Sequence, residues 1–155
     1  MDDGLKRCFK QKKGMKLIKP SENLAKEYMK SAEETLFILQ TVKGKSNMWL
    51  ATTKYYTEYF AVYALLMKIG IKSEIHDCTI ELCKFLEKQE IIPKGFSRVL
   101  EDDKEIRIDN QYYLKNKKVN VDIKKLRDFI FIIKHKINII TFDELNEIRG
   151  KLKKL

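Results

Sequence analysis

Apolar residues recur along most of this chain at spacings of three, four or seven positions, the period of an amphipathic α-helix. In the first such segment, residues 20–44, the recurring positions are Leu24, Tyr28, Thr35, Leu36, Leu39 and Val42. Pro20 and Ser21 are suited to begin this helix, and Gly44 is suited to stop it. Glu22 would lie in the first turn, where the helix dipole favours a negative charge.

The second segment is apolar over most of its circumference. Four tyrosines fall within residues 55–63, and two rows at helical spacing hold Trp49, Tyr56, Phe60, Tyr63 and Met67, and Tyr55, Tyr59, Val62 and Leu66. Charge is limited to Lys54, Glu58 and Lys68, of which the first two can pair at four residues apart. Such a helix must be covered on most sides. We therefore interpret the tyrosines mainly as core; the alternative is an exposed shelf on which bases stack.

Four later segments also predict helices. Residues 73–90 place Ile75, Thr79, Leu82 and Leu86 on one face, and residues 96–113 place Phe96, Val99, Asp103, Ile106, Asn110 and Tyr113 at heptad-like steps. The alternating segments EIRID and KVNVDI would also suit a β-hairpin, but we favour a helix for residues 96–113. Asp122 can cap the next helix, whose apolar side is Leu126, Phe129, Ile130, Ile133, Ile137 and Ile140. Thr141 and Glu144 have the spacing of a capping box at the start of the last predicted helix.

These elements predict one all-α domain, since 155 residues suffice for a single core. Residues 20–140 would form an up-and-down antiparallel bundle of about five helices. Residues 141–155 would form a short amphipathic tail helix whose stripe is Phe142, Leu145, Ile148 and Leu152. Residues 1–19 hold seven Lys or Arg against two Asp with little apolar periodicity, so we expect a mobile basic arm.

The formal net charge of +10 brings polyanions, nucleic acid above all, among the partners to consider, although a basic surface can also be an ordinary solvated one. Cys8, Cys78 and Cys83 form no CxxC pair and leave an odd thiol, and no apolar leader precedes them, so we expect a reducing, cytoplasmic setting. The longest uncharged run, residues 59–67, is far shorter than the roughly 20 residues that cross a bilayer, so we expect no membrane contact.

Two blocks together resemble the HEPN family of small prokaryotic helical proteins. The first is the Tyr-rich helix ending in KIG, followed by a short loop and the histidine of SEIHD. The second is RIDNQYYLKNKKVNVDIKKLRDFIFIIKHKI, in which an arginine, an acidic or amide residue and a tyrosine precede a loop and a long Phe- and Ile-rich helix. The family positions are matched by His76, Arg107, Asp109, Asn110, Tyr112 and Tyr113, and the resemblance covers residues 21–140.

The resemblance implies an all-α bundle, commonly a homodimer, that often works beside a minimal nucleotidyltransferase in toxin–antitoxin-like pairs. Many members are metal-independent ribonucleases whose last long helix carries an arginine and, after about four to six residues, a histidine that assists the reacting oxygens. Arg127 and His135 are the matching residue types here, but seven residues separate them. Positions eight apart differ by about 80° around a helix, so the family motif is not matched.

His76 and Arg107 are the other candidates for chemistry. They can tie the third and fourth predicted helices together through Asp109 or a tyrosine, or they can contact a ligand. Near a helix start the dipole does not favour a cationic histidine, so we expect a neutral, hydrogen-bonding role for His76. His76 and Cys83 could share a helix face, but two ligands without a second cluster do not make a zinc site, and we expect no metal or cofactor.

The nucleic-acid-binding or nucleotide-binding candidates are Arg107, Tyr112, Lys115, Lys117, Lys118, Lys124 and Lys125. The sequence therefore favours a HEPN-like homodimer that binds RNA or a nucleotide as a regulatory component, beside a minimal nucleotidyltransferase. The alternatives are a divergent ribonuclease that uses His76, Arg107 or His135, and a purely structural partner subunit that docks through its tail stripe.

Overall fold

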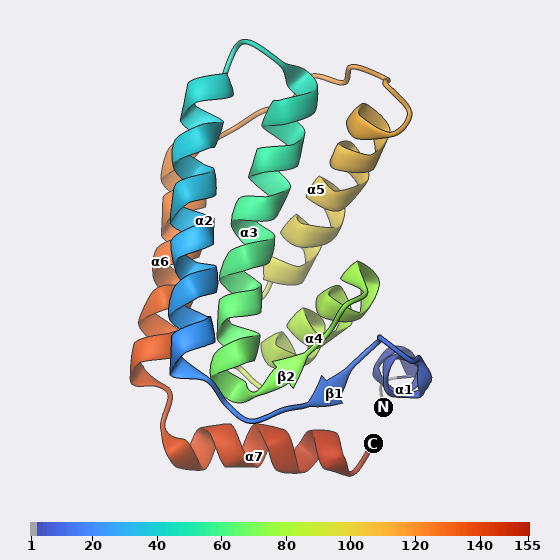
Figure 1. Cartoon of the computed structure of the whole chain (residues 1–155), viewed down its shortest axis with the longest axis vertical. Helices are drawn as coiled ribbons and strands as arrows, with labels where there is room; N and C mark the ends of the chain where they lie inside the picture. Colours follow the sequence, from blue (N-terminus) through green and yellow to red (C-terminus); the bar gives the residue numbers. More distant parts are fainter. Residues whose placement is uncertain (1–2) are drawn as a thin grey trace.

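The computed structural model describes residues 3–155, which form seven helices and one two-stranded sheet (Figure 1). In chain order the elements are α1 (Asp3–Lys10), β1 (Lys16–Leu17), α2 (Glu22–Val42), α3 (Asn47–Ile69), β2 (Ile71–Lys72), α4 (His76–Lys88), α5 (Phe96–Gln111), α6 (Ile123–Ile139) and α7 (Phe142–Lys153). The predicted all-α bundle is thus confirmed. Within the described residues, every helix is too short or too polar to cross a bilayer.

Helix α3 stands at the centre of the bundle. It runs antiparallel to α2, and α5 and α6 pack on its other sides (Figure 1). Sixteen of its residues are buried, among them Tyr55, Tyr59 and Tyr63. A helix covered on most sides needs an apolar surface all round, which the tyrosines supply while their hydroxyls find polar partners. The interpretation of the aromatic segment as core is therefore correct, although Trp49 at its start is exposed.

The helix ends follow the capping chemistry of the sequence. The side chains of Ser21 and Asp122 accept hydrogen bonds from backbone N–H groups of the first turns of α2 and α6. Thr141 and Glu144 form the capping box that opens α7. Gly70 ends α3 with a φ of +87°, and a Cβ there would lie 2.5 Å from the carbonyl oxygen of Ile18. A glycine is therefore required both by the conformation and by the close approach of the chain before α2.

Residues 96–111 form a helix, as favoured over the hairpin, and residues 113–122 form no strand but an extended strap from α5 to α6. Asn110, which is buried, holds the start of this strap. Its side chain donates to the carbonyl oxygen of Lys117 at 3.0 Å and accepts from the backbone N–H of Lys117 at 2.7 Å. Leu114 and Asn116, both with positive φ, turn the chain at this point.

Residues 3–18 do not form the mobile arm that we expected from their charge. Leu5, Cys8 and Met15 are buried, β1 pairs antiparallel with β2, and Cys8 forms a disulfide with Cys78 of α4. The few apolar residues of this segment thus suffice to anchor it, because a covalent bond and a sheet add to their burial. Disulfides are rare in reducing compartments, and the sequence did not predict this one. Cys83, buried in α4, is the free cysteine.

Helix α7 lies across one end of the bundle, where α2 begins and where α3 and α6 end (Figure 1). Leu145, Ile148 and Leu152 are buried, and Phe142 is exposed. Arg149 Nη1 donates to the carbonyl oxygens of Ile18, Ile69 and Gly70. The tail stripe is therefore used largely within the chain, which leaves little of it to dock another protein.

Candidate functional site

An aromatic cluster surrounds His76 at the start of α4. The hydroxyl of Tyr55 lies 2.7 Å from Nδ1 of His76, and the ring of Tyr59 stacks on the imidazole with 4.5 Å between centroids. Tyr56 meets the same ring edge-on at 6.0 Å. The imidazole is thus held by three tyrosines of α3. Tyr55 and Tyr56 precede Tyr59 by four and three positions, spacings at which side chains are neighbours on a helix surface.

Arg107 of α5 joins this cluster. Its guanidinium carbon lies 4.9 Å from the ring centroid of Tyr55 and 5.4 Å from that of Tyr56, and Nη1 donates to the hydroxyl of Tyr56 at 3.2 Å. Exposed Tyr112 stands on the outer side, with its ring centroid 5.8 Å from the same carbon. His76 and Arg107 therefore meet through tyrosines of the central helix. Asp109 instead pairs with Lys115 and Lys117.

The electrostatics of the cluster favour a neutral imidazole. Burial lowers the pKa of His76, and the positive charges of Arg107 and Lys104 lower that pKa further, against a smaller opposing effect of Asp77. Burial likewise raises the pKa of Tyr55. A neutral histidine bonded to an un-ionised phenol is suited to hold α3 and α4 together. This is the neutral, hydrogen-bonding role that we expected for His76.

Arg127 and His135 are both exposed on α6. Eight positions on a helix correspond to about 12 Å along its axis, so the two side chains start more than two turns apart. The ring of His135 stacks on exposed Phe131, with 6.3 Å between centroids. The geometry of this pair does not converge on one reacting atom, which agrees with the mismatch in the sequence motif.

A buried charged triad joins α3 to α5. The ammonium group of Lys54 lies 3.4 Å from Oε2 of Glu58 and also pairs with the carboxylate of Asp103. Asp103, which the sequence places at a heptad-like step of this helix, is buried, because the turn of α5 on which it lies faces α3. Burial raises the pKa of Glu58, and the neighbouring Asp103 raises it further.

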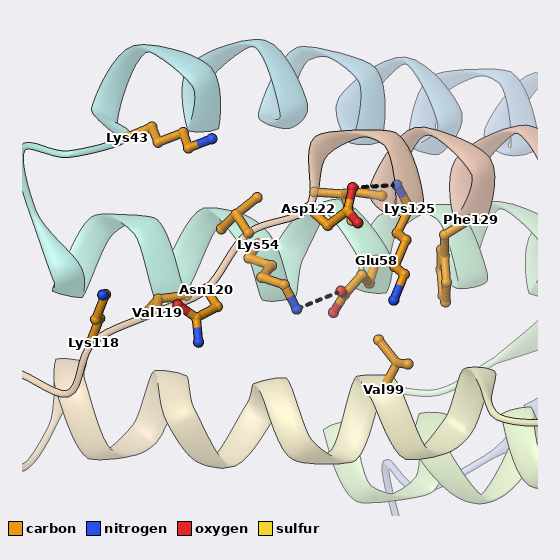
Figure 2. Close-up of a pocket in the computed structure, with 12 residues that line it drawn as sticks. Lys43, Lys54, Glu58, Val99, Lys118, Val119, Asn120, Asp122, Lys125 and Phe129 are labelled. Atoms are coloured by element: carbon orange, nitrogen blue, oxygen red, sulfur yellow. Dashed lines mark hydrogen bonds and ion pairs between the residues drawn. The ribbon is translucent and has the colours of Figure 1, made fainter.

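A cavity of about 630 Å³ opens beside this triad (Figure 2). Its lining comes from the end of α2, from α3 and α5, from the strap and from the first turns of α6. The lining residues are Lys43, Lys54, Glu58, Val99, Lys118, Val119, Asn120, Val121, Asp122, Lys125, Leu126 and Phe129. Four lysines face two acidic residues, so the cavity carries a positive balance around apolar walls. Its volume lies in the range of small-molecule sites.

The predicted binding lysines lie on the strap and the start of α6, and all are exposed. Lys118 and Lys125 line the cavity, while Lys115 and Lys117 pair with Asp109 beside it. Lys124 is exposed next to Lys125. The sequence did not single out Glu58 and Asp103 as a buried pair or Lys43 as a neighbour of the strap. The available signal was the lone acidic residue in a nearly uncharged helix, at pairing distance from Lys54.

Among residues 3–155, no three His, Cys, Asp or Glu side chains come together in a way that could hold a metal ion. Comparison of the chain with protein-family models, with curated proteins and with solved structures finds no match.

Proposed function

We propose that this protein is a HEPN-like regulatory component that binds single-stranded RNA, and that the phosphate backbone follows the strap and the start of α6. The observation that carries the proposal is the lysine-rich lining of the cavity, to which Lys43, Lys118 and Lys125 contribute exposed side chains. Lysines gathered at one end of a bundle attract polyanions, and the apolar walls beside them can accept bases.

The family resemblance supplies the setting of this proposal. A homodimer acting beside a minimal nucleotidyltransferase is the arrangement that the resemblance implies. Exposed aromatic residues on the outside of α2, α6 and α7 are available for contacts with a second copy or a partner: Phe37, Phe131 and Phe142 are 73%, 68% and 76% exposed. None of these three residues lines the cavity, so RNA binding there leaves them accessible.

Fluorescence anisotropy with an unstructured RNA tests the proposal. Affinity should fall steeply with salt, because each phosphate contact to a single strand contributes about 0.7 to the slope of log K against log salt. Charge reversal to Glu at Lys117, Lys118, Lys124 and Lys125 should weaken binding at least tenfold. The matched control reverses Lys12, Lys13, Lys153 and Lys154, which are exposed near the opposite end. Undetectable or salt-independent binding, or equal loss in both variants, would contradict the proposal.

The rival function is a divergent ribonuclease, for which His76, Arg107 and His135 are the candidate groups. The observation in its favour is that a buried arginine and a histidine share one tyrosine cluster. A metal-free cleavage assay on wild type, His76→Ala and His135→Ala separates the two functions. We expect no cleavage by any of the three proteins. Cleavage by the wild type that one substitution abolishes would establish the rival.

A further inference from the structure

Glu58 lines the cavity, and one oxygen of its buried carboxyl group has no hydrogen-bond partner among the described residues. Its side chain is 1% exposed, and Oε1 has no hydrogen-bond partner among residues 3–155, while Oε2 accepts from Lys54. Figure 2 shows the carboxyl group pointing from α3 into the space between α3 and α5. A buried acceptor without a partner costs free energy that a donor on a ligand would recover.

The walls around this oxygen are apolar and partly flat. Val99 of α5, Val119 and Val121 of the strap, and Leu126 and Phe129 of α6 line the cavity. The ring of Phe129 is held in place by Phe96, on which it stacks with 4.2 Å between centroids. These walls suit a planar ring, because such a ring fills an apolar slot and keeps polar groups only at its edge.

The lining residues differ in charge and in exposure. Lys43, Lys118 and Lys125 are exposed, Leu126 and Phe129 are buried, and the buried carboxyl group of Glu58 lies beside the Lys54 ammonium group. A ligand that matches this arrangement has an anionic group outside, a planar ring inside and an N–H donor on the ring. A nucleotide has all three features, and its phosphate would remain beside Lys43, Lys118 and Lys125.

We infer that the cavity holds one unpaired nucleotide of the bound RNA, whose exocyclic amino group donates to Oε1 of Glu58. This inference rests on the proposed function and adds a base preference to it. Cytosine and uracil have the same size, but uracil presents a carbonyl oxygen where cytosine presents the amino group. Because the lone pairs of Oε1 accept from an amino group and repel a carbonyl oxygen, cytosine binds better than uracil.

The test compares ten-nucleotide oligo(C) and oligo(U) in anisotropy titrations at one salt concentration. The wild type should bind oligo(C) more tightly by a factor of about five or more, as expected for one base-specific hydrogen bond. Glu58→Gln, whose amide can both donate and accept, should bind both oligomers about equally and keep the wild-type salt dependence. Circular dichroism and thermal unfolding establish that the variant is folded.

A second variant fills the cavity from α5. Val99 is 39% exposed, so Val99→Trp places a ring in the opening without disturbing the core, and oligo(C) should then bind no better than oligo(U). Leu24→Trp on α2, at a site 44% exposed, is the matched control and should retain the preference.

The outcomes separate this inference from the proposed function. Equal affinity of the wild type for the two oligomers, or a preference that survives both Glu58→Gln and Val99→Trp, would overturn the inference. The proposed function would stand in that case if binding still depended on the strap lysines. No binding of either oligomer to the wild type would overturn both.

Discussion

The hydroxyl of Tyr55 lies 2.7 Å from Nδ1 of His76, and this contact joins the central helix to the start of α4. Tyr55 is completely buried, and His76 is stacked on Tyr59. The histidine that the sequence offered as a catalytic candidate is thus part of the packing between α3 and α4. Replacing Tyr55 by Phe would leave a half-buried ring nitrogen without this partner, a cost of about 1 kcal/mol.

The surroundings of His76 also predict a pH dependence of stability, because burial and the charges of Arg107 and Lys104 lower its pKa. The pKa of His76 is lowered from 6.5 in the folded protein, so the unfolded chain binds a proton there more readily than the folded protein does. The free energy of unfolding should therefore fall as pH drops below about 6.5. Urea titrations between pH 7.5 and 5 should show a smaller fall for His76→Gln than for the wild type. Exposed His135→Gln is the control, and an equal fall in all three proteins would contradict the prediction.

Removing the cation of the buried triad should destabilise the fold. Lys54→Met leaves the carboxyl groups of Glu58 and Asp103 beside each other, and we expect a loss of roughly 2 to 4 kcal/mol near neutral pH. The loss should shrink toward pH 5, where the two carboxyl groups can share a proton. Lys30→Met is the control, because Lys30 forms an exposed pair with Glu34 that contributes less than about 1 kcal/mol. Equal losses at both sites, measured by urea unfolding, would show that the triad is not buried as described.

The disulfide between Cys8 and Cys78 can be tested by counting free thiols. Thiol titration in denaturant should find one reactive thiol, Cys83, before reduction and three afterwards. The bond spans 70 residues, for which a chain-entropy estimate gives about 4 kcal/mol of stability. Dithiothreitol should therefore lower the unfolding midpoint of the wild type but leave that of Cys8→Ser unchanged. Three reactive thiols in protein that has not been reduced would contradict the assignment.

Arg149 should contribute more to the stability of the fold than the other charged side chains of α7 do. Because its guanidinium group serves three carbonyl oxygens where β1, α3 and α7 meet, Arg149→Met should cost about 2 to 4 kcal/mol. Arg149→Lys should recover only part of this loss, since an ammonium group cannot reproduce the planar fork. Lys151→Met, which removes a surface pair with Glu147, should change stability by less than about 1 kcal/mol. A loss at Arg149 no larger than that at Lys151 would contradict this role.

The sequence predicted those parts of the fold that depend on local chemistry. The ring-rich pattern of α3 identified the central helix, and Ser21, Asp122 and Thr141 identified helix starts, because capping and amphipathic spacing act within a few residues. The prediction of a helix over residues 96–111 was also correct. Asp103 and Asn110 are polar, but they occur at the helical spacing that the apolar residues of this segment follow.

The features that the sequence missed are contacts between distant residues. Asp103 lies 49 residues from Lys54, so nothing near it in the chain distinguishes it from the exposed Asp102. Cys8 and Cys78 likewise belong to segments with no shared pattern. The cavity arises because the strap passes over the end of the bundle, and this path is set by Asn110 through its bonds to Lys117. Such relationships follow from packing, which the local pattern does not specify.

Methyl NMR during RNA titration tests the central claim, that RNA binds over the strap and into the cavity beside Glu58. The account predicts that the methyl signals of Val99, Val119, Val121 and Leu126 shift and saturate together, while those of Ile148 and Leu152 under α7 stay in place. Saturating shifts at α7 or α1, with the four cavity residues unchanged, would contradict it.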